Sequence, residues 1–293
     1  MLTTKLYQFK DQILKDYRNK PIKKCSLISM HFNDRLSKSM LLSLMATSKY
    51  KFSHIKIYID SPEVHLEEFQ DLIDIVDYST VTKTFYRYQE IKDNNMSLWN
   101  KTYAILSSLD QKVSDKNNIL WLDNDILFFD SFYDFCFLKN DTIYYYNNYV
   151  YNQFGKFTDN CKLYKLNTGL IAIPENIASK LDIDNILVKF KEQIDLEIEN
   201  PKMRVWSNEQ GFNAMVLSDG FKIDSVNNRF NLFKKHALST STDRTVEATK
   251  KHIDKFYPIC LHMIAGSWRR HLLELENIWL KYYLDRVGKH QQV

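Results

Sequence analysis

Two acidic residues stand one position apart near the middle of this 293-residue chain. Asp123 and Asp125 enclose Asn124, and apolar or aromatic residues flank them on both sides. A short run of this kind predicts a buried strand, here over residues 118–130. Because side chains alternate across a strand, both carboxylates are expected on one face, about 6.6 Å apart.

Two like charges at that separation need compensation when they are buried. A hard divalent cation such as Mg²⁺ or Mn²⁺ supplies it, since such ions prefer oxygen ligands and leave positions open for substrate phosphates. The alternative is a strand that ends at Leu122 and is followed by a solvated turn, which is the commoner outcome for an isolated pair of aspartates. A solvated turn seldom continues into an apolar run such as residues 126–129, so the pattern favours a metal site.

The elements that must position these carboxylates alternate between strands and helices. The apolar patterns predict helices over residues 1–20, 36–48, 64–75 and 98–109, and strands over residues 26–32, 55–59 and 80–88. This order predicts a mostly parallel sheet with helices on both faces and ligands at the carboxyl ends of its strands. The layout is Rossmann-like, but a chain with six glycines has neither the dinucleotide fingerprint nor a P-loop.

The order of elements becomes mixed after residue 130. Strands are expected over residues 142–151, 163–174, 221–226 and 258–264, helices over residues 175–194, 207–217 and 271–286, and a polar loop over residues 152–160. No repeat and no linker rich in Pro, Gly or Ser divides the chain. We therefore expect one domain over residues 1–293, with a nucleotide-binding half at 1–130 and an acceptor-side half at 131–293.

Composition narrows the class of protein. The net charge is +4 with both signs interspersed, which disfavours nucleic acid as a partner. The four cysteines contain no C-x-x-C pair and are expected to be ordinary core residues in a reducing compartment. The polar beginning of the chain and the lack of a long apolar run predict a cytoplasmic protein, at most peripheral to the inner face of a membrane.

Five motifs follow one another after the predicted parallel half. They are WLDNDILFF at 121–129, LNTGLIAIPE at 166–175, SNEQGFN at 207–213, VNNRFN at 226–231 and CLHMIAGSWR at 260–269. In this order and spacing the chain resembles metal-dependent GT-A fold glycosyltransferases, above all the family-eight-like group, over about residues 24–282. The stretch HMIAGSW is also similar to the family-thirty-two-like sugar transferases. The asparagine inside DND and the SWR ending differ from the small residue and the K-P-W of many relatives.

The resemblance implies transfer of a sugar from a nucleoside-diphosphate sugar, first of all a UDP-sugar, to a glycan or another acceptor with Mn²⁺ or Mg²⁺ as cofactor. It implies that Asp123, Asp125 and His262 hold the metal, with Asp123 also a possible partner of the ribose. For the donor it implies Phe32 and Asn33 near the base and ribose. The positions that it places near the diphosphate are Lys101, Gly266 and Arg269.

The resemblance places Asn167, Glu209 and Gln210 at the reacting sugar. Each of these assignments has a structural alternative, such as a polar bulge at Asn167 or a helix start at Glu209. A buried core histidine at position 262 and a surface lysine at position 101 are the corresponding alternatives there. The amide of Gln210 favours a retaining course, whereas Glu209 keeps an inverting base open.

Other classes of function stay open at this point. A metal-dependent nucleotidyltransferase or phosphotransferase shares the sheet and the acidic pair, but it needs a glycine-rich basic first loop. Residues 31–39 (HFNDRLSKS) contain no glycine. A non-catalytic relative that binds a sugar or a partner protein is another alternative, and the presence of both aspartates together with His262 argues against it. A transferase effector that modifies a host protein stays open.

Overall fold

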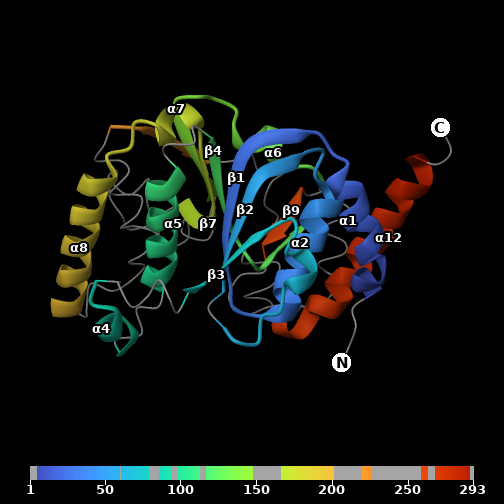
Figure 1. Ribbon diagram of the computed structural model, residues 1–293, viewed down its shortest axis with the longest axis horizontal. Coiled ribbons are helices and arrows are strands. Elements are labelled where there is room, and N and C mark those ends of the chain that lie inside the picture. The colour runs from blue at the N-terminus through green and yellow to red at the C-terminus, as the bar shows by residue number, and fades with distance from the viewer. Residues whose placement is uncertain are drawn as a thin grey trace, which may run out of the picture.

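The computed structural model describes residues 5–59, 61–78, 86–93, 98–112, 117–147, 166–200, 220–225, 259–262 and 268–290. These residues form a seven-stranded sheet and a second sheet of two strands, with helices on both sides (Figure 1). The predicted mostly parallel α/β architecture is confirmed.

The main sheet has the strand order β3-β2-β1-β4-β7-β6-β8. Among these strands β7 runs antiparallel to both of its neighbours, whereas the other adjacent pairs are parallel. The strands span Ile22–His31 (β1), Lys51–Ile59 (β2), Asp74–Asp77 (β3), Asn118–Asp123 (β4), Thr142–Asn147 (β6), Leu166–Ile173 (β7) and Lys222–Ser225 (β8).

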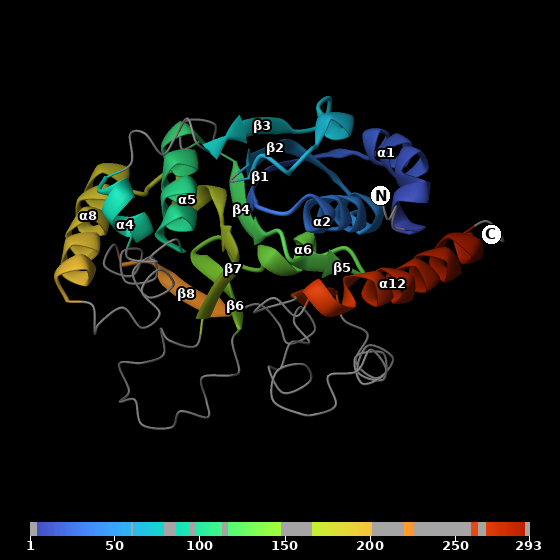
Figure 2. The same ribbon diagram turned by 90° about the horizontal axis from the view of Figure 1, so that it is seen from below.

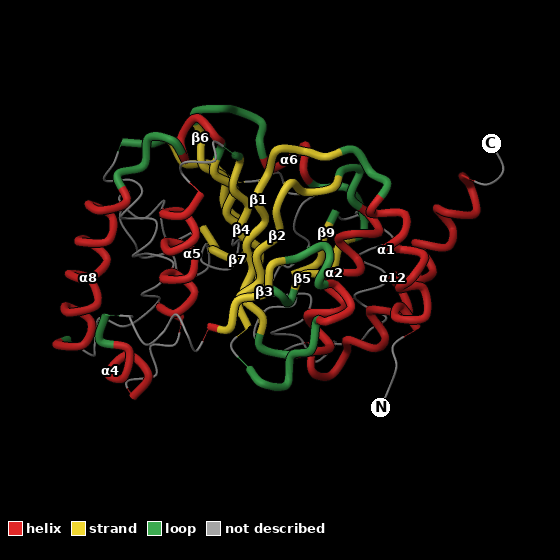
Figure 3. The backbone as a smooth tube through the Cα atoms, in the orientation of Figure 1, coloured by secondary structure: helices red, strands yellow, loops and turns green. Residues whose placement is uncertain are grey.

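Helices cover the two faces of this sheet (Figure 3). One face carries η1 (Lys5–Phe9), α1 (Lys10–Arg18), α2 (Asp34–Thr47) and α12 (Trp268–His290). The other carries α4 (Tyr88–Asp93), α5 (Leu98–Lys112) and α8 (Ile183–Glu199). The short helices are η2 (Glu67–Phe69), α6 (Tyr133–Cys136) and α7 (Glu175–Ala178).

The central strands are buried on both faces. Along β4, Leu120 and Leu122 pack into the core on the α2 face, while Ile119 and Trp121 pack into the core on the α5 face. None of the four is more than 1% exposed. A parallel strand covered on both sides reads as a continuous apolar run, which explains why the sequence here shows no polar alternation.

The predicted helix over residues 64–75 is wrong. The chain instead makes the single 3-10 turn η2 and then β3, which pairs in parallel with β2 through Lys56 opposite Asp74. Residues 74–77 pair with the edge of β2, and this pairing satisfies their backbone N–H and C=O groups. An amphipathic sequence pattern does not reveal that such an edge is available. The strand predicted over residues 80–88 is wrong at its end, where Tyr88 begins α4, and residues 79–85 lie outside the described chain.

The predicted helix over residues 175–194 divides into α7 and α8. The second helix begins afresh because the side chain of Asp182 caps it, accepting a hydrogen bond of 3.0 Å from the backbone N of Asn185. Apart from the run 118–130, the other predicted strands and helices within the described residues are confirmed to within a few positions. The helix expected at 207–217 and the loop expected at 152–160 lie outside them.

The second sheet joins two distant parts of the chain. Strand β5 (Ile126–Phe128) pairs antiparallel with β9 (Cys260–His262), so that Ile126 lies opposite His262. Beyond β5, the backbone N of Phe129 donates to Ile259 O at 2.7 Å. The C-terminal segment is thereby fixed to the residues that directly follow the two aspartates.

Helix α12 is held on α2 by a buried carboxylate. Glu276 is 0% exposed, accepts a hydrogen bond from Ser39 Oγ, and pairs with Arg35 Nη2 at 3.0 Å. Burial raises the pKa of Glu276, although the contacts with Ser39 and Arg35 oppose that shift. Desolvation of the carboxylate therefore outweighs its two partners.

The described cysteines agree with the compositional expectation. Cys25, Cys136 and Cys260 are buried, and burial raises the pKa of each thiol. They are core residues, as expected, whereas Cys161 lies outside the described chain. No helix in the described part combines the length and the apolar character that crossing a bilayer requires.

The raised pKa of Glu276 predicts a pH-dependent stability. Because the folded state holds this proton more tightly than the unfolded state, the contribution of Glu276 falls as pH rises above its ordinary pKa of 4.5. Urea unfolding of the wild type and Glu276→Gln should show the wild type losing stability relative to the variant from that pH toward neutrality. Glu67→Gln, at an exposed glutamate, is the matched control and should not change the slope. A wild-type advantage that grows with pH would contradict the prediction.

Candidate active site

The two aspartates lie at the carboxyl end of β4, beside the end of β1. Met30 of β1 is in register with Asp123, and the four strands β3, β2, β1 and β4 lie side by side (Figure 2). The chain leaves β1 toward β2 on one side and reaches β4 on the other. This point is a topological switch, where open α/β sheets bind their ligands.

The prediction of one strand over residues 118–130 is wrong at its centre. Strand β4 ends at Asp123, a turn follows over residues 124–125, and β5 leaves the main sheet to pair with β9. The solvated turn is also wrong, because Asn124 is 1% exposed and Asp125 is half-buried. The two carboxylates therefore lie on either side of the buried Asn124 at a turn. The separation of about 6.6 Å expected for two residues on one face of a strand does not apply.

Trp121 orients the first carboxylate. Its indole Nε1 donates a hydrogen bond of 3.1 Å to Asp123 Oδ1, and the two residues lie two positions apart on the same strand, hence on the same face. By sequence pattern alone, Trp121 is only an apolar strand residue. The spacing of two between an indole and a carboxylate was the signal that could have revealed this contact.

His31 lies at the end of β1 with a defined ring tautomer. Ser29 Oγ donates to Leu122 O at 2.6 Å, so it accepts from His31 Nε2 at 3.0 Å. The proton therefore sits on Nε2 and Nδ1 is an acceptor. Burial lowers the pKa of His31 to about 3, so the ring is neutral at physiological pH.

Two buried side chains at this edge have polar atoms that make no described hydrogen bond. His31 Nδ1 and both side-chain polar atoms of Asn124 have no hydrogen-bond partner among the described residues. A buried polar group without a partner costs about 1–3 kcal/mol. The middle residue of the motif thus points its amide into the protein, and Asp123 and Asp125 flank it.

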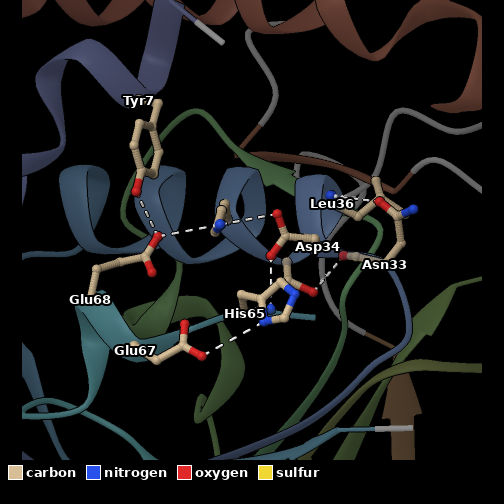
Figure 4. A network of polar contacts seen from close by, with 9 residues as sticks. Tyr7, Asn33, Asp34, Leu36, His65, Glu67 and Glu68 are labelled. Carbon is tan, nitrogen blue, oxygen red and sulfur yellow. Dashed lines mark hydrogen bonds and ion pairs between the residues drawn. The ribbon is translucent and has the colours of Figure 1, made fainter. Parts of the chain in front are cut away.

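The first turn of α2 is tied to the loop after β2 (Figure 4). Asn33 Oδ1 caps the helix by accepting from Leu36 N at 3.1 Å. Asp34 Oδ1 accepts from His65 N at 2.9 Å, and its other oxygen accepts from Lys38 Nζ at 3.0 Å. These contacts give the segment after β1 a fixed shape.

Phe32, directly after β1, is 49% exposed, so it is not a core residue. It lies between the end of the strand and the capped start of α2. The cap occupies Asn33 Oδ1 and leaves the amide Nδ2 as the group that Asn33 can direct to a ligand.

The topology brings further predicted positions to the same edge. His262 lies opposite Ile126, one residue beyond Asp125. Asn167 is near the start of β7, which lies beside the end of β4 because these two strands are antiparallel. Lys101 is in the first turn of α5, the helix that precedes β4.

The structure describes the backbone but not the side chains of Lys101, Asn167, His262 and Arg269, the second residue of α12. Glu209, Gln210 and Gly266 lie outside the described residues. Among the described side chains, no three His, Cys, Asp or Glu residues gather closely enough to hold a metal ion. The oxygens of Asp123 and Asp125 are the ligand type that Mg²⁺ and Mn²⁺ prefer, and His262 is paired one residue beyond them, opposite Ile126.

Comparisons with known proteins identify the fold. No protein-family model and no curated protein sequence matches the chain. Among solved structures, the chain is similar to the apo form of the glycosyltransferase GlyE of Streptococcus pneumoniae TIGR4. The TM-score is 0.52 at 18% identity, over 89% of this chain and 60% of GlyE.

A second structure of GlyE gives a TM-score of 0.50 at 14% identity, over the same shares of the two chains. An active-site mutant of LgtC gives 0.49 at 16% identity, over 82% of this chain and 87% of LgtC. The GlyE likeness shows that this chain has the GT-A type α/β fold of glycosyltransferases. It spans 60% of the length of GlyE.

Because the buried amide of Asn124 has no described hydrogen-bond partner, truncation of this side chain should cost little stability. Asn124→Ala removes buried polar atoms that have no described partner, so the free energy of unfolding should change by less than about 1 kcal/mol or increase. Asn118→Ala is the matched control, because its amide donates to Tyr133 Oη at 2.7 Å and accepts from Glu175 N at 2.8 Å. The control should lose about 1–3 kcal/mol in urea unfolding. An equal loss in both variants would show that Asn124 is satisfied.

Proposed function

We propose that this protein is a metal-dependent glycosyltransferase. It transfers a sugar from a nucleoside-diphosphate sugar, first of all a UDP-sugar, to a hydroxyl group of a glycan acceptor. The observation that carries the proposal is the turn that holds Asp123 and Asp125 at the switch point between β1 and β4, with His262 paired opposite Ile126, the residue after Asp125. The fold shared with GlyE supports the same class.

Asp123, Asp125 and His262 would hold Mn²⁺ or Mg²⁺. When bound, the ion would neutralise the charge that develops on the departing diphosphate. The hydrogen bond from Trp121 orients the carboxylate of Asp123, which would present its oxygens to the ion. A ligand oriented in advance costs less to order when the metal and donor bind.

The donor nucleotide would lie over the end of β1. Phe32 offers an exposed aromatic ring to the base, and the Asn33 amide offers N–H donors to the base or ribose. We assign Lys101 and Arg269 to the diphosphate, where cations stabilise the leaving group. Gly266 would let the backbone approach the phosphates closely.

Asn167, Glu209 and Gln210 would surround the reacting sugar. With Gln210 as a polar group at the sugar face, the leaving phosphate itself can take the proton of the acceptor hydroxyl, which gives retention. An inverting enzyme would instead need Glu209 within hydrogen-bond reach of that hydroxyl as a base. The amide at position 210 leads us to propose retention.

Asp125→Asn tests the metal-dependent function. The variant keeps the size of the side chain but removes the charge that attracts the ion, so UDP release from a panel of UDP-sugars with Mn²⁺ should fall about 100-fold or more. Asp134→Asn, at an exposed aspartate that pairs with Lys49 at 3.5 Å, is the matched control and should keep full activity. EDTA should abolish the wild-type reaction. Unchanged turnover in Asp125→Asn, or full activity in excess EDTA, would overturn the proposal.

The retaining course predicts the anomeric configuration of the product. Proton NMR of the glycoside formed from an α-linked UDP-sugar should show a new α-linkage. Glu209→Gln should keep most of the activity, since a retaining enzyme needs no carboxylate base there. A β-linked product, together with loss of transfer in Glu209→Gln, would identify an inverting enzyme.

A further inference from the structure

A pocket of about 510 Å³ lies between α1, α2, α12 and the residues that follow β5. Its volume is within the range of small-molecule sites. Lys20, just before β1, and Thr47, the last residue of α2, both line it. The pocket is therefore at the amino-terminal edge of the parallel strands, whereas Asp123 is at their carboxyl edge. The ten residues of β1 run from one edge to the other, which is about 30 Å.

One side of the pocket is aromatic. Trp279 and Tyr283 stack with ring centroids 5.0 Å apart and an interplanar angle of 11°, and Tyr282 meets Phe129 edge-on at 6.0 Å. Tyr282 and Tyr283 are half-buried and line the pocket, so part of each ring is exposed to it. Such rings present an apolar face together with a polar hydroxyl group.

The other side of the pocket carries balanced charge. Asp16 and Asp130 line it together with Lys20 and Lys49, so its two carboxylates and two ammonium groups give no net charge. Net charge alone therefore favours neither an anionic nor a cationic ligand in this pocket. The pocket suits a neutral ligand that offers both hydroxyl groups and an apolar face.

Lys20 is occupied by the protein itself. Its Nζ donates to Met45 O at 2.8 Å, to Ala46 O at 3.3 Å and to Ser48 O, which completes the C-terminal turn of α2. An ammonium group has three N–H donors, and these three carbonyls use them. Burial lowers the pKa of Lys20 to about 8. This lysine shapes the wall of the pocket and is not a site for an anion.

The walls of the pocket are formed in advance. Trp279 Nε1 donates to Phe128 O, which fixes α12 against β5. Ser131 Oγ accepts from Lys49 N at 3.3 Å, which joins the end of α2 to the segment after β5. A rigid, preformed pocket lowers the entropic cost of binding a small ligand.

We propose that this pocket binds one neutral pyranose unit of a glycan. The sugar would lay its apolar face on Tyr282 and direct hydroxyl groups to the carboxylates and hydroxyls of the opposite wall. The site is separate from the transfer site at the other edge of the sheet. Its use as a remote subsite for the acceptor glycan rests on the proposed function, but binding of the sugar does not.

Ligand-observed saturation-transfer NMR tests this site directly. The probes are the methyl α- and β-pyranosides of glucose, galactose and N-acetylglucosamine. At least one of them should receive saturation from the wild-type protein. Tyr282→Ala should weaken that binding at least about tenfold, because the apolar face of the sugar loses its stacking surface. Tyr282→Phe, which keeps the ring, should stay within about threefold of wild type.

A second variant and a control complete the experiment. Thr47→Trp fills the pocket from the α2 side and should abolish binding even if Tyr282→Ala fails to fold. Val188→Ala, which truncates an exposed apolar side chain of α8 on the other face of the sheet, should bind the pyranoside as the wild type does. No saturation transfer to any probe, or binding that survives Thr47→Trp, would overturn the proposal.

The two proposals fail independently. Asp125→Asn, which tests sugar transfer, should bind the pyranoside with unchanged affinity. Pocket binding in a wild-type protein that releases no UDP would refute the transferase and leave the sugar site standing. If the protein releases UDP from UDP-sugars with Mn²⁺ but binds none of the probes, the transferase is supported and the sugar site is refuted.

Discussion

The buried turn after Asp123 is the constraint on which the rest of the structure depends. At this turn β4 ends and the chain leaves the main sheet to form β5. Three contacts then hold β5 in place. Its backbone pairs with β9, Phe128 N donates to Ser43 Oγ of α2 at 3.1 Å, and Phe128 O accepts from Trp279 of α12. A displacement of the turn would therefore disturb both ends of the chain.

This arrangement links the candidate chemistry to the stability of the fold. Strand β9, which carries His262, pairs with β5. Helix α12 contacts β5 through Trp279 and is itself held on α2 by the ion pair of Glu276 with Arg35. Removal of Arg35 would leave the fully buried carboxylate of Glu276 without its charged partner. Helix α2, which starts after β1, therefore contacts α12 through Arg35 and Ser39 and contacts β5 through Ser43.

Much of the fold could be predicted from the sequence, because its signals are local. Apolar runs indicated β1 and β4, and the alternation of isoleucines with Lys56 and Tyr58 indicated β2. The stripe over residues 98–109 indicated α5. The order of these elements then placed the DND motif at the carboxyl edge of the sheet. The candidate donor set of Asp123, Asp125 and His262 came from motif order. The register of β5 with β9 places His262 opposite Ile126, and its role as a metal ligand stays a prediction.

The sequence by itself therefore determined the class of fold, the edge at which the acidic residues lie and the core character of the strands around them. Only the tertiary structure decided that the run 118–130 breaks at Asp123, that residues 74–77 form a strand, and that Asn124 is buried. Each of these outcomes depends on a partner far away in the sequence, such as β9 for β5 or β2 for β3. Backbone groups pair wherever a distant edge is available, and local periodicity carries no information about that edge.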